Sequence, residues 1–124
     1  MSDINHAEYI KTIFCDFDGC IVKHYGSLSQ ILNSPCVLLP GVKEKFDIWC
    51  RCGYKVIITT GRPESARLFT MKQIERLGLY YHALIMGLPR GQRVVFNDVK
   101  PDSNIPTAAC INLERNGGME NVNI

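Results

Sequence analysis

Apolar residues in this chain gather in short runs, and polar, glycine-rich or proline-containing stretches separate these runs. Short continuous apolar runs are typical of strands that are buried on both faces of a parallel sheet. The runs predict about five strands, over residues 10–16, 55–59, 82–86, 93–96 and 108–112.

Two helices are predicted between the first three runs. In the first, over residues 42–52, apolar side chains recur at helical spacing, and Gly53 provides a C-terminal stop. The second runs from Pro63, which suits a first helical turn, to Leu77. The expected buried positions are Val42, Phe46, Trp49 and Cys50 in the first helix, and Met71, Ile74 and Leu77 in the second.

The alternation of strands and helices predicts an α/β fold, a Rossmann-like doubly wound and mainly parallel sheet of about five strands with right-handed crossovers. Residues 21–40 show no sustained period and predict an irregular or hairpin-like flap. The interval between Asp18 and Thr60 leaves no room for a large cap domain, because domains have at least about 50 residues. Residues 1–9 are expected to form a loose lead-in, and the glycine- and asparagine-rich residues 116–124 a mobile tail.

The link over residues 87–92 is shorter than a helical crossover, which needs at least about 10 residues. A hairpin at this link would make the strands on its two sides antiparallel. One of the two strands would then point away from the edge at which the others end. The strand order beyond the third strand therefore stays open.

Length and composition indicate one domain over residues 1–124, with 46% apolar and 21% charged residues. The net charge of +2 is small and the basic residues are scattered, so no nucleic-acid partner is expected. No apolar run reaches the roughly 20 residues that span a bilayer, and no signal peptide is recognisable, so we expect a cytoplasmic chain with no membrane partner. The six cysteines lack zinc-site spacing and are expected to be free thiols. A homo-oligomer is compatible with these features.

Polar residues follow three of the predicted strands. Asp16 and Asp18 end the first, Thr60 follows the second, and Asp98 ends the fourth. The carboxyl ends of parallel strands meet at one edge of a sheet, where α/β proteins bind ligands. Two carboxylates two residues apart on an extended chain point the same way and repel unless a cation or a proton lies between them. The pair suits phosphoryl transfer, in which one carboxylate attacks phosphorus and the other moves protons, whereas the alternative is a solvated turn.

Together these motifs resemble those of the haloacid dehalogenase superfamily of phosphohydrolases. Residues 16–19 match its first motif, Asp-x-Asp-Gly after a strand. Residues 57–60 match its second, an apolar strand that ends in Thr or Ser, and residues 94–98 match its fourth, an apolar strand that ends in acidic residues. The resemblance extends over residues 11–102. The acidic residue at position 18 is similar to the residue that the phosphatase branch of the superfamily has there.

The resemblance implies a role for each matched residue. Asp16 would be the nucleophile that forms an aspartyl-phosphate, and Asp18 would be the general acid and base. Thr60 and the amide of Gly61 would hold phosphate oxygens. Mg²⁺ would be bound by Asp16, Asp98 and the backbone carbonyl of Asp18. A hydroxyl, an amide and a cation suit the charge that spreads over the phosphate oxygens in the transition state.

The third motif of the superfamily is a cation that pairs with the nucleophile and the phosphate. Arg90, which follows the third predicted strand, and Arg93, which begins the fourth, are the candidates, and the position of Arg90 at the expected edge favours it. Asp102 stands four residues after Asp98, with Asn97 where the superfamily variant has Gly. Asp102 would then hold a metal-bound water, or it is a solvated turn carboxylate.

Three of these residues have structural alternatives. Arg62 would reach the substrate or simply precede a helix. Thr60 would cap the helix that begins near Pro63, and Asp98 would cap a helix or close a turn. His24, in the flap, would touch the substrate or be an exposed histidine, and the exposed position is favoured.

These observations favour a Mg²⁺-dependent phosphomonoester hydrolase that works through an aspartyl-phosphate on a small-molecule phosphate ester. By resemblance to small uncapped members, a sugar phosphate of a surface-polysaccharide pathway is a candidate substrate. Two other classes stay open. A receiver-like phosphoacceptor domain would need an acceptor aspartate where this chain has Thr60, and a catalytically silent phosphate-binding protein would not turn over its ligand.

Overall fold

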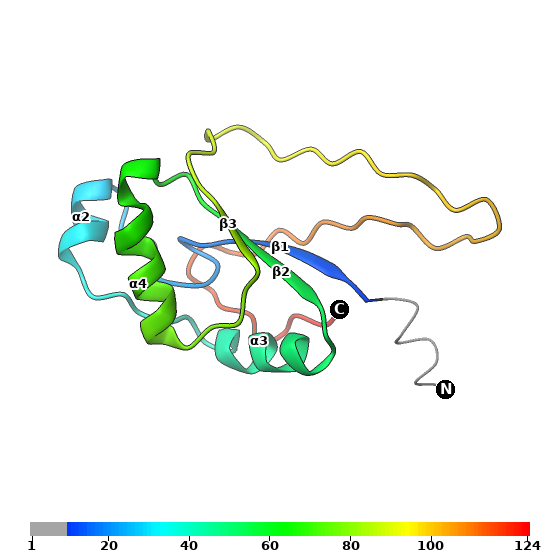
Figure 1. Ribbon diagram of the computed structural model, residues 1–124, viewed down its shortest axis with the longest axis horizontal. Coiled ribbons are helices and arrows are strands. Elements are labelled where there is room, and N and C mark those ends of the chain that lie inside the picture. Colours follow the sequence, from blue (N-terminus) through cyan, green and yellow to red (C-terminus); the bar gives the residue numbers. More distant parts are fainter. Residues whose placement is uncertain (1–9) are drawn as a thin grey trace.

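The computed structural model describes residues 10–124, and the expected lead-in over residues 1–9 lies outside them (Figure 1). The elements in chain order are β1 (Thr12–Asp16), α2 (Leu28–Asn33), α3 (Val42–Arg51), β2 (Lys55–Thr59), the 3-10 helix η1 (Glu64–Ala66), α4 (Arg67–Leu77) and β3 (Ala83–Ile85).

A parallel sheet in the order β1-β2-β3 forms the centre of the molecule. In its register Asp16 is level with Thr59, so β1 and β2 end at the same edge. Lys55–Thr59 is rich in β-branched residues, which suit a central strand. The described part of the chain is therefore a small mixed α/β protein, and the strands predicted at 10–16, 55–59 and 82–86 are confirmed.

The two faces of the sheet differ in how much of them is covered. Cys15, Ile58 and Leu84 are neighbours in the register on one face, and all three are buried in the core with Phe46 and Ile74. Right-handed crossovers between sequential strands place the connecting helices on one side of a sheet, which agrees with this burial. The opposite face is open.

On the open face, Phe14, Ile57 and Ala83 share one register line, and Phe14 is 62% exposed. Ile85 on the same face is 41% exposed. No helix follows β3 in the described residues, and residues 87–92 are too few to form a helical crossover that would cover this face.

The strands predicted over residues 93–96 and 108–112 are wrong for the described chain, which has three strands in its sheet. Residues 91–112 instead form an extended excursion, here called the arm, that projects from the body and turns back (Figure 1). A strand requires a neighbour for its backbone groups as well as a suitable sequence. The short link after β3 does not lead residues 93–96 back to the sheet.

The helices differ from their predictions in the faces that they bury. Cys50 is exposed, although Val42, Phe46 and Trp49 are buried as expected. In α4 the buried positions are Thr70, Gln73 and Ile74, whereas Met71 is exposed. Two of these positions are polar because they contact a buried guanidinium, which hydrophobic periodicity does not detect.

The flap over residues 21–40 is hairpin-like at its base and helical at its tip. Val22 forms an antiparallel bridge with Leu38 at the base. The six residues of α2 at the tip were not predicted. Ser27 begins that helix with a capping box, in which its hydroxyl and the Gln30 side chain satisfy each other's backbone amide groups.

The tail packs against the body, so its predicted mobility is wrong. Met119 is buried in the core, and its amide donates to the Pro40 carbonyl at 2.8 Å. The Asn116 amide donates to the Gly19 carbonyl at 2.9 Å. Asn116 has a φ of 63°, a left-handed conformation that asparagine tolerates better than most residues. The last residues are therefore part of the structure around β1.

All six cysteines are free thiols, as expected. Their burial differs, since Cys15 is buried whereas Cys50, Cys52 and Cys110 are exposed. None of the helices within residues 10–124 has the length and apolar character needed to cross a bilayer.

Candidate active site

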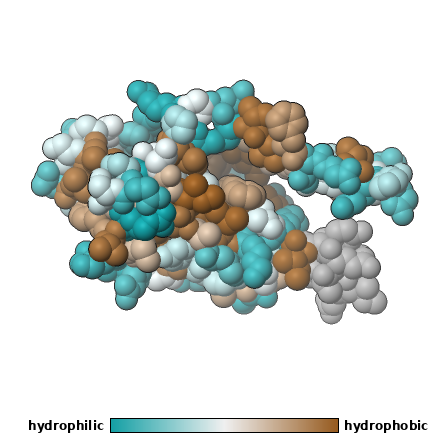
Figure 2. All heavy atoms as spheres, turned by 45° about the horizontal axis from the view of Figure 1, so that its top comes forward, coloured by the Kyte–Doolittle hydropathy of each residue, from teal (hydrophilic) through white to brown (hydrophobic). Residues whose placement is uncertain are grey.

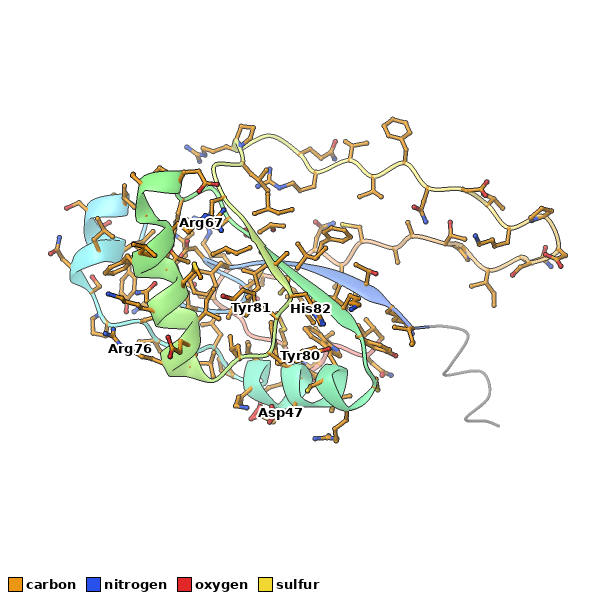
Figure 3. The ribbon with its side chains drawn as sticks, viewed as in Figure 1. Asp47, Arg67, Arg76, Tyr80, Tyr81 and His82 are labelled. Atoms are coloured by element: carbon orange, nitrogen blue, oxygen red, sulfur yellow. The ribbon has the colours of Figure 1, made fainter. Side chains whose placement is uncertain are left out.

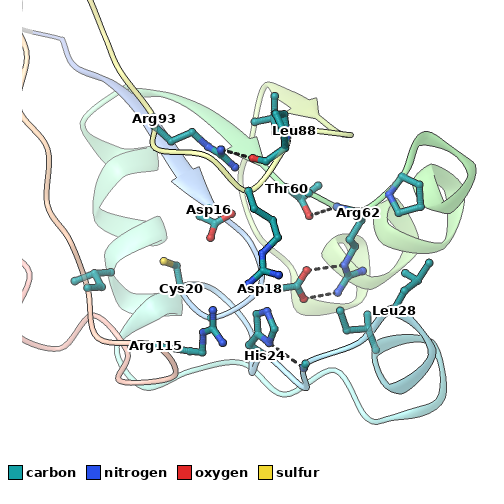
Figure 4. Close-up of a pocket in the computed structure, with 18 residues that line it drawn as sticks. Asp16, Asp18, Cys20, His24, Leu28, Thr60, Arg62, Leu88, Arg93 and Arg115 are labelled. Atoms are coloured by element: carbon teal, nitrogen blue, oxygen red, sulfur yellow. Dashed lines mark hydrogen bonds and ion pairs between the residues drawn. The ribbon is translucent and has the colours of Figure 1, made fainter.

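A cavity of about 720 Å³ lies beyond the carboxyl ends of β1 and β2 (Figure 4). Its walls come from the end of β1, the flap, the loop after β2, the link after β3, and residues 113–115 just before the tail. Most of the residues predicted for the site lie here, namely Asp16, Asp18, Thr60, Gly61, Arg62, Arg90 and Arg93. The edge of the sheet thus places side chains from distant parts of the chain around one space, as expected for a parallel sheet.

Asp16 is the last residue of β1 and faces the cavity. It keeps access to solvent, but the surrounding protein removes enough water to raise the pKa of its carboxyl above the ordinary value. The positive charge of Arg93 opposes this rise, and the nearby negative charge of Asp18 adds to it. Asp16 is not held in an ion pair within the described chain, and its carboxyl faces the cavity.

Asp18 is bound by Arg62 through two parallel hydrogen bonds. Arg62 Nε donates to one carboxylate oxygen at 2.9 Å and Nη2 to the other at 2.8 Å. The guanidinium lies over the Phe17 ring, 4.7 Å from its centroid. Bidentate pairs of this kind fix both partners in orientation as well as charge.

Arg62 is only 5% exposed and also reaches α4. Its Nη1 donates to Thr70 Oγ1 at 3.0 Å and to Gln73 Oε1 at 2.6 Å. Arg62 stands just before η1 and lines the cavity, and its side chain is in addition the buried counter-ion of Asp18, a role that the sequence did not predict. The nearest signal in the sequence is the pair of polar residues on a helix face that should be apolar.

Thr60 and Gly61 follow β2 and form the cavity wall between Asp16 and Arg62. Thr60 is buried, and its Oγ1 accepts a hydrogen bond from the Arg62 amide at 3.1 Å. A side chain at Gly61 would approach the Leu88 carbonyl to 3.1 Å, so the loop fits glycine best. This wall places a hydroxyl and a turn backbone where a phosphate could lie.

Both arginines proposed for the third motif line the cavity. Arg93 Nη1 donates to the carbonyls of Pro89 and Gly91, at 2.6 and 2.8 Å, and these bonds hold its side chain over Asp16. Two further side chains, His24 and Arg115, also line the cavity, and Arg115 adds a positive charge to its wall. Arg115 was missed from the sequence, although it stands between an apolar run and the turn-forming residues 116–118.

His24 is fixed between the flap and the tail. Its backbone amide donates to Asn116 Oδ1 at 2.7 Å, and its Nδ1 accepts from the Gly26 amide at 2.9 Å. The ring therefore turns its other nitrogen away from the flap backbone. The cavity contains more positive than negative groups, which suits an anionic ligand.

Asp98, Asn97 and Asp102 lie on the arm, and the cavity is formed without them. The Asn97 side-chain amide donates to the Thr107 carbonyl at 2.9 Å, and the Asp98 carbonyl accepts from the Thr107 hydroxyl. These bonds join the two sides of the arm. The structure thus brings Asp16 and Asp18 together but does not bring Asp98 to them.

The side chains around the cavity do not complete a magnesium site. Arg62 occupies both oxygens of Asp18, and Asp16 is the other carboxylate in the wall. Across residues 10–124, no three acidic, histidine or cysteine side chains lie close enough together to hold one metal ion. Mg²⁺ prefers an octahedral shell of oxygen ligands, to which one free carboxylate contributes little.

Comparison of the chain with protein-family models, with curated proteins and with solved structures finds no match. The functional argument therefore rests on the residues and their geometry.

Proposed function

We propose that this chain is a phosphomonoester hydrolase of the haloacid dehalogenase type, with a single Rossmann-like domain and with Asp16 as its nucleophile. One observation carries the proposal: Asp16, which is held in no ion pair of the described chain, faces a cavity rich in arginines at the sheet edge, beside the turn of Thr60 and Gly61. An anionic phosphate attracted by Arg90 and Arg93 would meet the Asp16 carboxylate there.

The proposed reaction has two steps. A carboxylate oxygen of Asp16 attacks phosphorus, the P–O bond to the alcohol breaks, and the leaving oxygen takes a proton. Water then attacks the phosphorus of the aspartyl-phosphate, loses a proton, and releases inorganic phosphate with the Asp16 carboxylate restored. Thr60, Gly61 and Arg90 are proposed to hold the phosphate oxygens.

Asp18 is proposed to move both protons, and its ion pair sets a condition on this role. Both of its oxygens accept from Arg62, so at least one hydrogen bond must open before Asp18 can hold or receive a proton. Arg62 is thus proposed to orient the Asp18 carboxylate, because its guanidinium binds both Asp18 oxygens while Thr70 and Gln73 of α4 hold it in place. A requirement for Mg²⁺ belongs to the proposal. The cavity supplies Asp16 as its only carboxylate that Arg62 does not bind, so the described residues do not complete the shell of such an ion.

The proposed substrate class is a small phosphate ester, with a sugar phosphate of polysaccharide biosynthesis as the first candidate. A cytoplasmic location is proposed because free thiols, as in all six cysteines here, are typical of a reducing compartment.

The test is phosphate release from a panel of phosphomonoesters that includes sugar phosphates, with Mg²⁺ and with a chelator. Asp16→Asn should lower the rate by at least about a thousandfold, because it removes the nucleophile. Asp47→Asn is the matched control, since Asp47 lies on the outer surface of α3 and pairs with Lys43 (Figure 3). Full activity of Asp16→Asn would exclude the proposed nucleophile.

The ion pair of Asp18 favours a second candidate, a phosphate-ester-binding protein without turnover. If the pair never opens, the cavity binds anions but lacks a proton carrier. Calorimetric binding of a phosphate ester to the wild-type chain, with no phosphate release, would select this candidate over the hydrolase.

A further inference from the structure

Arg115 stands at the corner of a tight turn beside the cavity. The Gly117 amide donates to the Glu114 carbonyl at 3.0 Å, which closes the turn and leaves Arg115 and Asn116 as its two central residues. Asn116 has a φ of 63°, a conformation that the second central position of such a turn accepts. Since Arg115 lines the cavity, this closed turn presents its side chain there (Figure 4).

Contacts with distant parts of the chain fix the turn in place. The Asn116 side-chain oxygen accepts from the His24 amide at 2.7 Å, and the Asn116 amide donates to the Gly19 carbonyl at 2.9 Å. The stem of Arg115 lies against Gly19, where an added β-carbon would be 3.4 Å from Arg115 Cγ. The backbone that carries Arg115 is therefore ordered before a ligand arrives, which lowers the cost of binding one.

The charge of Arg115 is not used by another side chain of the described chain. Within residues 10–124 the ion pairs that involve arginine are those of Arg62 and Arg67. Asp18 is already bound at both oxygens by Arg62. A guanidinium presents a planar fork of N–H donors that fits carboxylate and phosphate oxygens. Arg115 therefore offers a ligand a site for an anionic group.

Positive side chains lie on two sides of the cavity. Arg93 lies on the same side as Thr60, whereas Arg115 and His24 lie across the cavity from them, beside the flap (Figure 4). A volume of about 720 Å³ is typical of sites for ligands much larger than a phosphate group. A ligand whose phosphate lies at Thr60 therefore reaches toward Arg115 with the rest of its structure.

The largest exposed apolar side chain of the molecule lies on the arm. Figure 2 shows apolar atoms on the surface where the arm leaves the body, and Phe96 is 93% exposed. The cavity walls instead present arginine side chains and the Thr60 hydroxyl. Such groups favour a ligand with charged and hydrogen-bonding groups over an apolar ester.

We propose that Arg115 binds a second anionic group of the substrate, a carboxylate or a second phosphate, on the part of the molecule that leaves as the alcohol. Asn116 is the positioning residue that holds the turn of Arg115 against the flap. The inference rests on the proposed function, because that function places the reacting phosphate at Thr60 and Gly61. It narrows the substrate class from small phosphate esters to those with two separate anionic groups.

The first test measures ligand binding and does not depend on turnover. Titration calorimetry on the Asp16→Asn variant compares two matched pairs of ligands. Sorbitol 6-phosphate is paired with 6-phosphogluconate, which has a carboxylate in place of the terminal alcohol, and fructose 6-phosphate is paired with fructose 1,6-bisphosphate. The ligand with the second anionic group should bind at least about tenfold more tightly in one pair, which identifies that group.

Variants of the turn then assign the preference to Arg115. Adding Arg115→Gln should remove the preference and leave the affinity for the ligand with one phosphate unchanged, whereas Arg115→Lys should keep part of it. Asn116→Gly accepts the same backbone conformation but lacks the bond to His24, so it should lower the preference by less than Arg115→Gln. Arg76→Gln is the matched control, because Arg76 is exposed in the last turn of α4 (Figure 3).

The outcomes separate this inference from the proposed function. A lack of preference in both pairs, or a preference that survives Arg115→Gln, would overturn the inference. Equal losses for both ligands of a pair would assign Arg115 to the reacting phosphate and would also overturn it. In the wild-type chain, kcat/KM for phosphate release should be higher for the preferred ester than for its partner. Preferred binding without any phosphate release would reject the hydrolase and keep the anion site.

Discussion

The sheet and the arm place similar apolar segments in opposite surroundings. Ile13 and Cys15 of β1 pack toward a core that two helices cover, and Cys15 is buried. Val94 and Phe96 of the arm are as apolar but lie in solvent. The difference does not come from side-chain preference, because both segments suit a strand. It comes from the connections, since β1 leads through α3 to a parallel neighbour, whereas the link that joins β3 to the arm is too short to turn the chain around.

Replacing one phenylalanine in each region should give the largest difference in the free energy of unfolding between the sheet and the arm. Phe46→Ala removes a fully buried ring from α3 and should lower the free energy of unfolding by about 4 kcal/mol. Phe96→Ala should change it by less than about 0.5 kcal/mol, because the ring is exposed. Urea denaturation at low protein concentration measures both. Similar losses for the two variants would mean that the arm packs on its own chain.

The next largest effect concerns the ion pair between Arg62, which is also bonded to α4, and Asp18 in the cavity wall. Arg62→Ala leaves Asp18 in a largely buried place without its counter-ion and should lower the free energy of unfolding by about 3 kcal/mol. Lys43→Ala removes a surface ion pair of α3 and should change it by less than about 0.5 kcal/mol. The same denaturation experiment compares them, and equal effects would contradict a structural role for the guanidinium.

Cysteine reactivity should give the smallest and most local difference between the regions. Burial raises the pKa of the Cys20 thiol to about 11, and it also raises the pKa of Cys15. Cys110 on the arm is exposed. At pH 8, iodoacetamide should therefore label Cys110 before Cys20 and Cys15.

The pH dependence has a definite sign. Because the pKa of Cys20 is raised, its thiolate fraction should grow about tenfold for each pH unit above 8 until the pH nears that pKa. An ordinary thiol is already largely ionised by about pH 9 to 10. Peptide mapping by mass spectrometry follows each site. Labelling of Cys20 as fast as Cys110 at pH 8 would mean that the end of β1 opens readily.

Much of the body and of the cavity could be predicted from the sequence. Apolar runs predicted β1, β2 and β3, and the polar residues at their ends predicted a common site for Asp16, Asp18 and Thr60. These features depend on neighbours within a strand–helix–strand unit, which short patterns describe well. The resemblance to a phosphatase family added roles for these residues, and the roles stay predictions.

The rest depended on contacts that no local pattern contains. The inward face of α4 is set by Arg62, which binds Thr70 and Gln73 from a loop before the helix. Phe96 lies in a sequence that predicts a strand, but pairing requires a partner at the right place and in the right direction. Asp98 lies away from Asp16 for the same reason, because its segment leaves the sheet.

The contact of Asn116 with Gly19 and His24 has a consequence for biosynthesis. The chain emerges from the ribosome with its amino end first, and domains generally fold as units during synthesis. The loop after β1 is translated early, yet the amide that caps the Gly19 carbonyl belongs to a residue made almost a hundred positions later. Nascent chains halted before residue 116 should therefore hold the nucleophile beside an unfinished wall, and ligand affinity should appear only late in translation.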